Sequence, residues 1–115
     1  MSDNSTTLGG VISDARKKLG ISQKGLAARI KRAEDDLPIS AQYLNDIEHN
    51  RRVPGSDHMI AQFASALKLQ ESYLFFLANR VPAQLRNLNP NPDEVDRFVR
   101  EAAVAFRRDV NKPGK

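Results

Sequence analysis

The chain has 115 residues, enough for one domain and a short extension but not for two independent hydrophobic cores. It carries 18 Lys and Arg against 14 Asp and Glu, and this net charge of +4 is compatible with a polyanionic partner. The absence of cysteine excludes disulfides and thiolate chemistry. The two histidines, His49 and His58, have no second pair to complete a metal shell, so we expect no metal and no cofactor.

No apolar run approaches the roughly 20 residues that cross a bilayer. The opening segment MSDNSTT has neither the basic part nor the apolar part of a secretory signal. We therefore expect a cytoplasmic protein without membrane contact.

The periodicity of apolar residues predicts helices throughout, because sustained alternation and hairpin turns are nearly absent. Residues 1–7 are polar and predict a disordered tail that ends in Thr7, a plausible N-cap. A first helix follows from Leu8, and Gly20 supplies its left-handed stop. Its expected buried face consists of Val11, Ile12, Ala15 and Leu19.

Two further capped helices are predicted next. Ser22 begins the second, with Leu26, Ala27 and Ile30 directed inward. The charged stretch 31–36 fits either extra helical turns or a solvated loop, and Pro38 excludes a helix running through it. Ser40 begins the third helix, which closes at His49 and Asn50 and carries Tyr43, Leu44 and Ile47 on one side.

The remaining elements follow the turn at Pro54 and Gly55. Ser56 and Asp57 begin a fourth helix, whose apolar residues are Met59, Ile60, Phe63, Ala64 and Leu67. The range 69–78 predicts a fifth, unusually apolar helix. A linker over 80–91 is rich in proline and has room for one short helical turn.

The last helix is predicted from Asn91 and Pro92 to about Val110, before a tail over 111–115. Its apolar stripe consists of Val95, Phe98, Val99, Ala102 and Phe106. The expected organisation is thus a tail (1–7), a helical domain (8–79), a linker (80–91), a C-terminal helix (92–110) and a second tail (111–115).

The segment 20–54 contains the most informative pattern. A capped helix, a connection and a second capped helix form the minimal unit that can lay one helix in a DNA groove. Ser22 and Ser40 place helix N-termini where backbone N–H groups can face phosphates. Polar residues at 42, 45 and 46 project from one side of the third helix, and Arg51 and Arg52 follow it.

Over about residues 8–79 the chain resembles the XRE family of helix-turn-helix regulators, which includes the Cro and cI-like phage repressors. The resemblance is carried by five elements in order: Ser22-Gln23, Leu26-Ala27, the run Ser40-x-x-Tyr43-Leu44-x-x-Ile47-Glu48, Arg52-x-Pro54, and Ala64-x-Ala66-Leu67. It implies an all-α, five-helix Cro/cI-like domain, here with an additional C-terminal helix. The chain departs from the family in a longer connection over 31–37 and in Asn50, which replaces the usual glycine.

The resemblance also implies a role for individual residues. The positions that face bases are Ala41, Gln42, Tyr43, Asn45 and Asp46. The positions that contact phosphates are Ser22, Gln23, Lys24, Ser40, Arg51 and Arg52, with Gln23 also bracing the third helix. Gln42 is the best candidate for a base contact, since its amide can pair with adenine N6 and N7.

Glu48 matches a family residue that pairs with an arginine of the first helix, here Arg16, so we favour a structural ion pair over a catalytic acid. Tyr43 is suited equally to a DNA contact and to covering the edge of the core. Asp46 can accept from cytosine N4, but beside phosphates its charge is unfavourable without an Arg neighbour. Lys31 and Arg32 are more simply solvated than bound to DNA, and His49 is more simply a solvated turn residue than a pH switch.

One five-helix domain cannot easily bury the aromatic residues Tyr73, Phe76, Phe98 and Phe106. Either the last helix folds back over the fifth, or these surfaces form a two-fold dimer interface, which we favour.

The predicted function is a sequence-specific regulator of transcription, more often a repressor than an activator, that binds a pseudo-palindromic site on double-stranded DNA as a homodimer. The alternative is an antitoxin or adaptor that uses the same fold to bind a partner protein. We do not expect an enzyme, because the sequence has no nucleophile–base pair, no phosphate-cradling glycine loop and no metal set.

Overall fold

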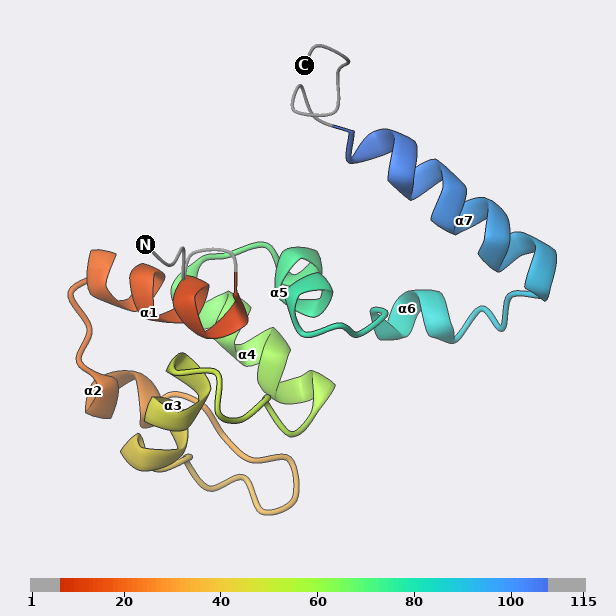
Figure 1. Ribbon diagram of the computed structural model, residues 1–115. Helices are drawn as coiled ribbons and strands as arrows, with labels where there is room; N and C mark the ends of the chain where they lie inside the picture. The colour runs from red at the N-terminus through yellow and green to blue at the C-terminus, as the bar shows by residue number, and fades with distance from the viewer. Residues whose placement is uncertain (1–6, 108–115) are drawn as a thin grey trace, which may run out of the picture. The chain divides into compact units, whose positions relative to one another are not determined.

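The computed structural model describes residues 7–107, and the chain divides into two compact units, the first ending at Ala83 and the second beginning at Gln84. The first holds α1 (Leu8–Lys18), α2 (Gln23–Ala27), α3 (Ala41–Glu48), α4 (Asp57–Leu67) and α5 (Glu71–Leu77), as Figure 1 shows. Beyond them lie α6 (Ala83–Arg86) and α7 (Pro92–Ala105). Within 7–107 there is no strand, only an isolated bridge between Lys31 and Pro38. The prediction of an all-α fold is confirmed.

Hydroxyl caps determine where the helices of the first unit begin. Thr7, Ser22, Ser40 and Ser56 each accept a hydrogen bond from the backbone N–H three residues further on. Each cap thus satisfies one of the N–H groups that a helix start leaves without a partner. Gly20 has φ +72°, the left-handed conformation expected after the first helix.

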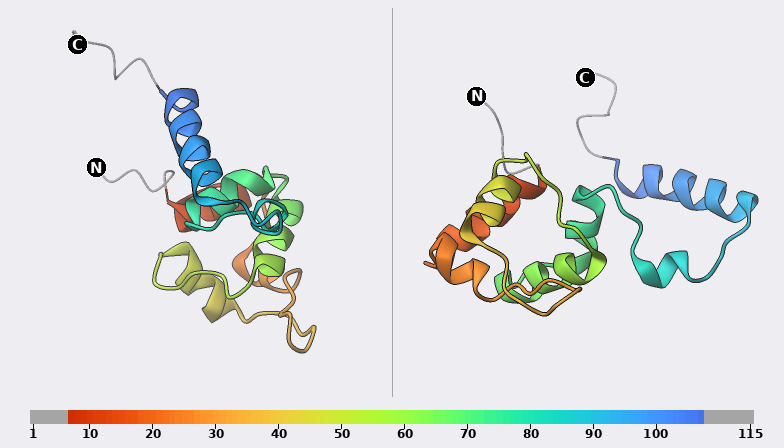
Figure 2. Two further views of the ribbon diagram at one scale, coloured as in Figure 1. Left: turned by 90° about the vertical axis from the view of Figure 1, so that its right-hand side faces the viewer. Right: turned by 90° about the horizontal axis from the view of Figure 1, so that it is seen from below.

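The core of the first unit lies between these five helices. α3 packs against α1 and α2, and α4 packs against α1 and α5. The two views in Figure 2 show α1, α2 and α3 grouped together and α4 beside them. The largest fully buried apolar side chains are Ile12, Leu26, Ile30, Leu44, Ile47, Pro54, Ile60, Phe63 and Leu74.

Leu19 is an exception to the predicted core. We expected it on the buried face of the first helix, but it is exposed. The helix ends at Lys18, and Leu19 is its C-cap, so its side chain no longer follows the periodicity of the buried face.

The start of α1 and the end of α3 approach each other closely at Gly9. A Cβ atom on Gly9 would lie 2.3 Å from the carbonyl oxygen of Ile47 and 2.6 Å from that of Glu48. The Gly9 N–H donates to Asn50 Oδ1 (3.0 Å), and Asn50 Nδ2 donates to Thr7 Oγ1 (3.0 Å). Asn50 has φ +62°, so it serves as the left-handed cap that glycine usually provides.

The connection between α2 and α3 is a loop, which settles the alternative left open for residues 31–36. Figure 2 shows its two arms leading from α2 to α3. The Arg32 N–H donates to Leu37 O (2.8 Å) across the loop. At its base the Gln62 side chain donates to Lys31 O and accepts from Lys31 N–H, both at 2.7 Å. The loop is therefore anchored by α4, the helix that carries Gln62.

Arg32 is paired within this loop. Its guanidinium donates to Asp35, whose carboxylate also accepts from the Leu37 N–H. The hydrogen bond from Arg32, followed by that from Leu37, lowers the pKa of Asp35 below its ordinary value. Arg32 is thus engaged inside the loop, in keeping with a solvated loop.

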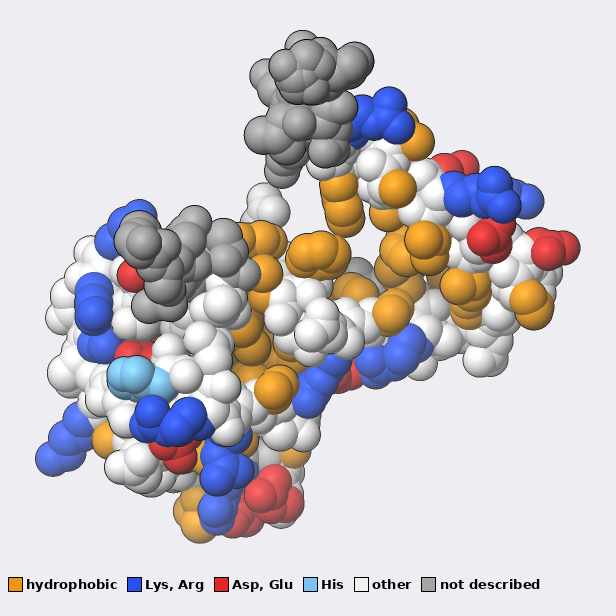
Figure 3. Space-filling view, viewed as in Figure 1, with side chains coloured by type: hydrophobic (Ala, Val, Ile, Leu, Met, Phe, Trp, Pro, Cys, Tyr) orange, Lys and Arg blue, Asp and Glu red, His pale blue; other side chains and the backbone are white. Residues whose placement is uncertain are grey.

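The second unit is dominated by α7. Asn91 and Glu94 form a reciprocal capping box with distances of 2.8 and 3.0 Å, and Arg100 donates to Asp96 (2.7 Å). No residue of α7 is buried. Figure 3 shows hydrophobic side chains along one side of this helix and charged ones along another.

Two predicted helices were too long. α7 ends at Ala105 with Phe106 as its C-cap, short of the predicted end near Val110, which lies outside the described residues. Phe106 therefore follows the helix and does not extend its stripe. The fifth helix covers Glu71–Leu77, shorter at both ends than the predicted 69–78. Of the predicted tails, only Thr7 lies within the described residues, and it caps α1.

We predict that Gly9→Ala destabilises the protein by about 1–3 kcal/mol, because its Cβ would overlap two backbone carbonyls of α3 that cannot move independently. Without this overlap, replacing glycine by alanine inside a helix would stabilise the protein by up to about 1 kcal/mol. Urea unfolding measures the difference. The control is Gly55→Ala, whose Cβ would meet only the Tyr43 hydroxyl at 3.4 Å. Equal stabilities for the two variants would contradict the close approach.

Candidate nucleic-acid interface

α3 has one side in the core and one outside it. Leu44, Ile47 and Glu48 are buried, whereas Ala41 and Gln42 are exposed. Asn45 and Asp46 are half-buried at the border between the two sides. The outer side is thus accessible within the first unit.

An ion pair fixes α3 to the two preceding helices. Arg16 of α1 donates from Nε to Glu48 Oε2 (2.6 Å) and from a terminal nitrogen to Glu48 Oε1 (3.0 Å). The side chains of Arg16 and Glu48 are only 11% and 3% exposed. Gln23 of α2 donates to the same Glu48 Oε1 (2.9 Å). Glu48 is therefore held in a structural role, as the resemblance implied.

Gln23 continues this network along α3. Its Nε2 also donates to Asn45 Oδ1 (3.1 Å). Asn45 therefore has a partner inside the protein, and its side chain is less free to reach a base than its position alone predicts. Gln23 lies where it braces α3, and its contact with phosphate stays a prediction.

A second network lies on the outer side of α3. Gln42 Nε2 donates to Asp46 Oδ1 (3.0 Å), and Arg51 donates to the same oxygen from Nε (3.3 Å) and from a terminal nitrogen (3.2 Å). The Arg51 N–H also donates to Asp46 O (2.8 Å). Asp46 thus has the Arg neighbour that a carboxylate beside phosphates requires.

The pairing of Asp46 with Arg51 was not predicted from the sequence. The spacing of Gln42 and Asp46, one helical turn apart, could have predicted the hydrogen bond between their side chains. The Arg51 contact depends on how the chain turns after α3, which no local pattern specified.

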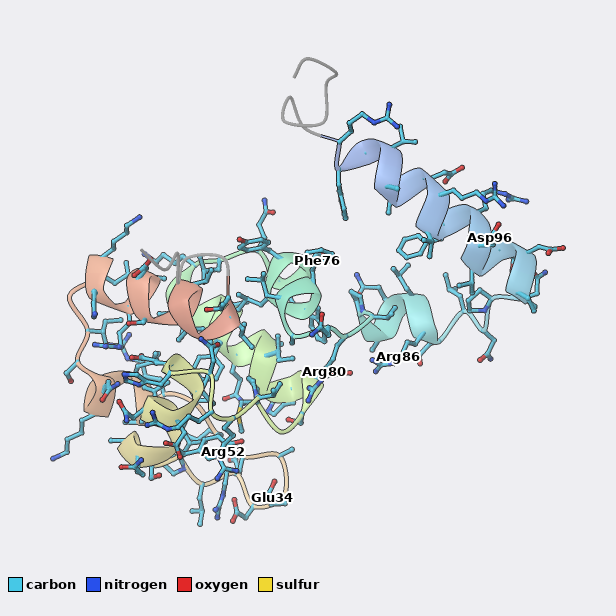
Figure 4. The ribbon with its side chains drawn as sticks, in the orientation of Figure 1. Glu34, Arg52, Phe76, Arg80, Arg86 and Asp96 are labelled. Carbon is cyan, nitrogen blue, oxygen red and sulfur yellow. The ribbon has the colours of Figure 1, made fainter. Side chains whose placement is uncertain are left out.

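Tyr43 and Arg52 form a stacked pair. The Arg52 guanidinium carbon lies 4.8 Å from the centroid of the Tyr43 ring, a cation–π geometry. Tyr43 is half-buried and packs against the buried core of the first unit. The structure therefore gives Tyr43 a place at the core edge, and Figure 4 shows Arg52 close to α3.

The other predicted phosphate contacts surround α3. The Ser22 and Ser40 hydroxyls are engaged in capping, and Lys24 is exposed on α2. Figure 3 shows Lys and Arg side chains, with a smaller number of acidic ones, over the part of the first unit that carries these helices. Glu34 lies on the neighbouring loop, as labelled in Figure 4. His49 is exposed, with its Nδ1 2.9 Å from Asn45 O, which fits a solvated turn residue.

The four predicted interface aromatics remain on the surface. Tyr73 and Phe76 of α5 are 44% and 58% exposed, and Phe98 and Phe106 of the second unit are 52% and 55% exposed. None of the four belongs to the buried core of the first unit.

Two kinds of feature are absent from the described residues. Within 7–107 no group of three or more His, Cys, Asp or Glu side chains is placed to hold a metal ion. No helix in the same range is long and apolar enough to span a membrane.

Comparison with known protein families gave a match to the first unit. A family model described as helix-turn-helix (HTH_3) matches residues 12–74, which is more than half of the chain and reaches from α1 into α5. No curated protein and no solved structure matched.

We predict that Glu48→Ala destabilises the protein by about 3 kcal/mol, because it leaves the Arg16 guanidinium, only 11% exposed, without its carboxylate partner. Urea unfolding measures the loss, and Asp14→Ala, which removes an exposed acid of α1, is the control. Surface changes of that kind usually alter stability by less than about 0.5 kcal/mol. A loss for Glu48→Ala no larger than that for Asp14→Ala would show that the ion pair does not hold α3.

Proposed function

This chain belongs to the XRE family of helix-turn-helix proteins, and we propose that it regulates transcription by placing α3 in the major groove of a specific DNA sequence. In general terms it is a DNA-binding helix-turn-helix regulator. One observation supports the placement of α3 in the major groove. The Arg16–Glu48 pair holds the inner side of α3 against the core, while Gln42 and the two arginines after the helix lie outside the core.

The proposed residues divide into those on the side of α3 that faces the bases and those that position the protein on phosphates. The base-facing positions are Ala41, Gln42, Tyr43, Asn45 and Asp46. The phosphate-facing positions are Ser22, Gln23, Lys24, Ser40, Arg51 and Arg52. Gln42 is the principal reader, because it is exposed and its amide matches adenine N7 and N6.

We further propose that the protein acts as a homodimer and represses transcription by occupying a pseudo-palindromic site. A two-fold dimer would present two copies of α3 about 34 Å apart, one turn of the duplex. The exposed aromatics Tyr73, Phe76, Phe98 and Phe106 supply apolar surface for such an interface.

A second function is favoured by α7. This helix is well capped and has an apolar side, yet none of its residues is buried. Such a helix suits a partner protein as well as a second copy, as expected for an antitoxin or adaptor. Co-purification of a second polypeptide with the full chain would favour this function.

We predict that Gln42→Ala and Arg52→Ala affect DNA binding differently. Gln42→Ala should lose about 1–3 kcal/mol of discrimination at one base pair. Arg52→Ala should weaken binding to all sequences alike and lower the salt slope by about one. The measurement is affinity for a duplex selected from random sequence, its single-base variants and a random duplex, at two salt concentrations.

The control for this experiment is Gln70→Ala, because Gln70 is exposed and makes no capping hydrogen bond at the start of α5. Equal losses on specific and random DNA for Gln42→Ala would refute its role as a base reader.

We predict that Tyr73→Glu or Phe98→Glu converts a dimer into a monomer, because a charge cannot enter an apolar interface without a partner. Phe98→Leu keeps the surface apolar and should leave the dimer intact. Sedimentation equilibrium gives the mass. A wild-type chain that is monomeric both free and on DNA would contradict the homodimer.

A further inference from the structure

The hydrogen-bond donors on the outer side of α3 converge on one carboxylate oxygen. Asp46 Oδ1 accepts from Gln42 and from two nitrogens of Arg51 at 3.0–3.3 Å. The Asp46 side chain is 22% exposed, whereas that of Arg51 is 56% exposed. A partly buried carboxylate thus links the proposed base reader to a proposed phosphate contact.

We propose that Asp46 is a positioning residue that determines specificity, acting through Gln42 and Arg51 and not through a base of its own. This inference rests on the proposed function of α3 in reading DNA. It assigns Asp46 two effects: it orients the Gln42 amide, and it restrains the charge of Arg51.

The first effect concerns the orientation of Gln42. The terminal torsion of a free glutamine is broad and roughly two-fold, so its amide nitrogen and oxygen exchange places readily. Reading adenine requires the oxygen to face the N6 amino group and an N–H to face N7. The bond to Asp46 uses one of the two Nε2 hydrogens and fixes which end is the nitrogen. Oε1 and the second hydrogen stay available as an ordered acceptor–donor pair.

The second effect concerns charge. A carboxylate at the DNA surface repels phosphates of every sequence, and Arg51 paired with it contributes less to counterion release. Asp46 therefore lowers affinity for random DNA, while at the correct base pair Gln42 compensates through its two hydrogen bonds. Because specificity is a difference between two affinities, lowering the affinity for wrong sequences raises it.

Two substitutions separate these effects. Asp46→Asn removes the charge but keeps an oxygen that accepts from Gln42, whereas Asp46→Ala removes both. Each variant is measured on the selected duplex, its single-base variants and a random duplex, at two salt concentrations. Asp14→Asn makes the same charge change at an exposed site on α1 and is the control.

Both Asp46 variants should bind the random duplex about threefold or more tighter, with a salt slope steeper by about one. Asp46→Ala should also lose at least about fivefold of the preference at the base pair read by Gln42, while Asp46→Asn keeps most of it. A Gln42→Ala, Asp46→Ala double variant should lose no more preference there than Gln42→Ala alone, because the two residues act as one unit. Asp14→Asn should leave the base preference unchanged.

Three results would overturn the inference. A change of preference at a different base pair in Asp46→Ala, additive with the effect of Gln42→Ala, would show that Asp46 contacts a base directly. An equal loss of affinity on all duplexes, together with lower stability in urea, would make Asp46 merely structural. If Asp46→Ala keeps the preference at the base pair read by Gln42, then Asp46 does not orient the Gln42 amide. If the wild-type chain selects no sequence at all, the proposed function itself fails, an outcome distinct from these three.

Discussion

The position of α3 depends on one buried carboxylate. Apolar packing by Leu44 and Ile47 holds the helix against the core, but apolar contacts are non-directional and tolerate small rotations and slides. Glu48 adds direction, because both of its oxygens are engaged by Arg16, and Gln23 bonds to one of them. Rotation of α3 about its axis would break these bonds and leave a buried charge without a partner. The helix therefore presents one defined side outward.

Close approach of the backbone adds a second constraint at the same end of α3. Gly9 lets the first turn of α1 lie against the carbonyls of Ile47 and Glu48, and Asn50 ties the turn after α3 back to Thr7 and Gly9. The ion pair and this contact together determine the position of α3 along its axis as well as its rotation. A helix held in this way can present side chains to DNA with little rearrangement, which favours discrimination between bases.

Local signals in the sequence predicted most of the fold, because caps and stops act over three or four residues. Ser22, Ser40 and Ser56 begin helices as expected, and Gly20 ends one. The Arg16–Glu48 pair followed from the family resemblance, not from local pattern. The loop after α2 was undetermined because its anchor, Gln62, lies 31 residues further along the chain. The Asp46–Arg51 contact was missed for a similar reason, since it depends on the path of the chain after α3.

The sequence did not predict what covers the apolar side of α7 or the four exposed aromatic residues. No residue of α7 is buried among the residues that the structure describes, so the apolar periodicity predicts a helix but not what covers its apolar side. A pattern of apolar residues is the same whether a helix packs on its own chain or on another. The outer side of α3 could be predicted more fully than the partner of α7. Its residues follow from the helix periodicity, and the buried Arg16–Glu48 network determines which side faces outward.

In the proposed function, the outer side of α3 reads base edges in the major groove. The most direct measurement replaces each adenine of a selected duplex in turn by 7-deazaadenine, which lacks the N7 acceptor of the major groove and leaves the minor groove unchanged. We expect affinity to fall at one adenine in each half-site for the wild-type chain, and this loss to disappear in Gln42→Ala. Binding that is insensitive to the replacement at every adenine, but abolished by a ligand occupying the minor groove, would show that α3 does not read the major groove.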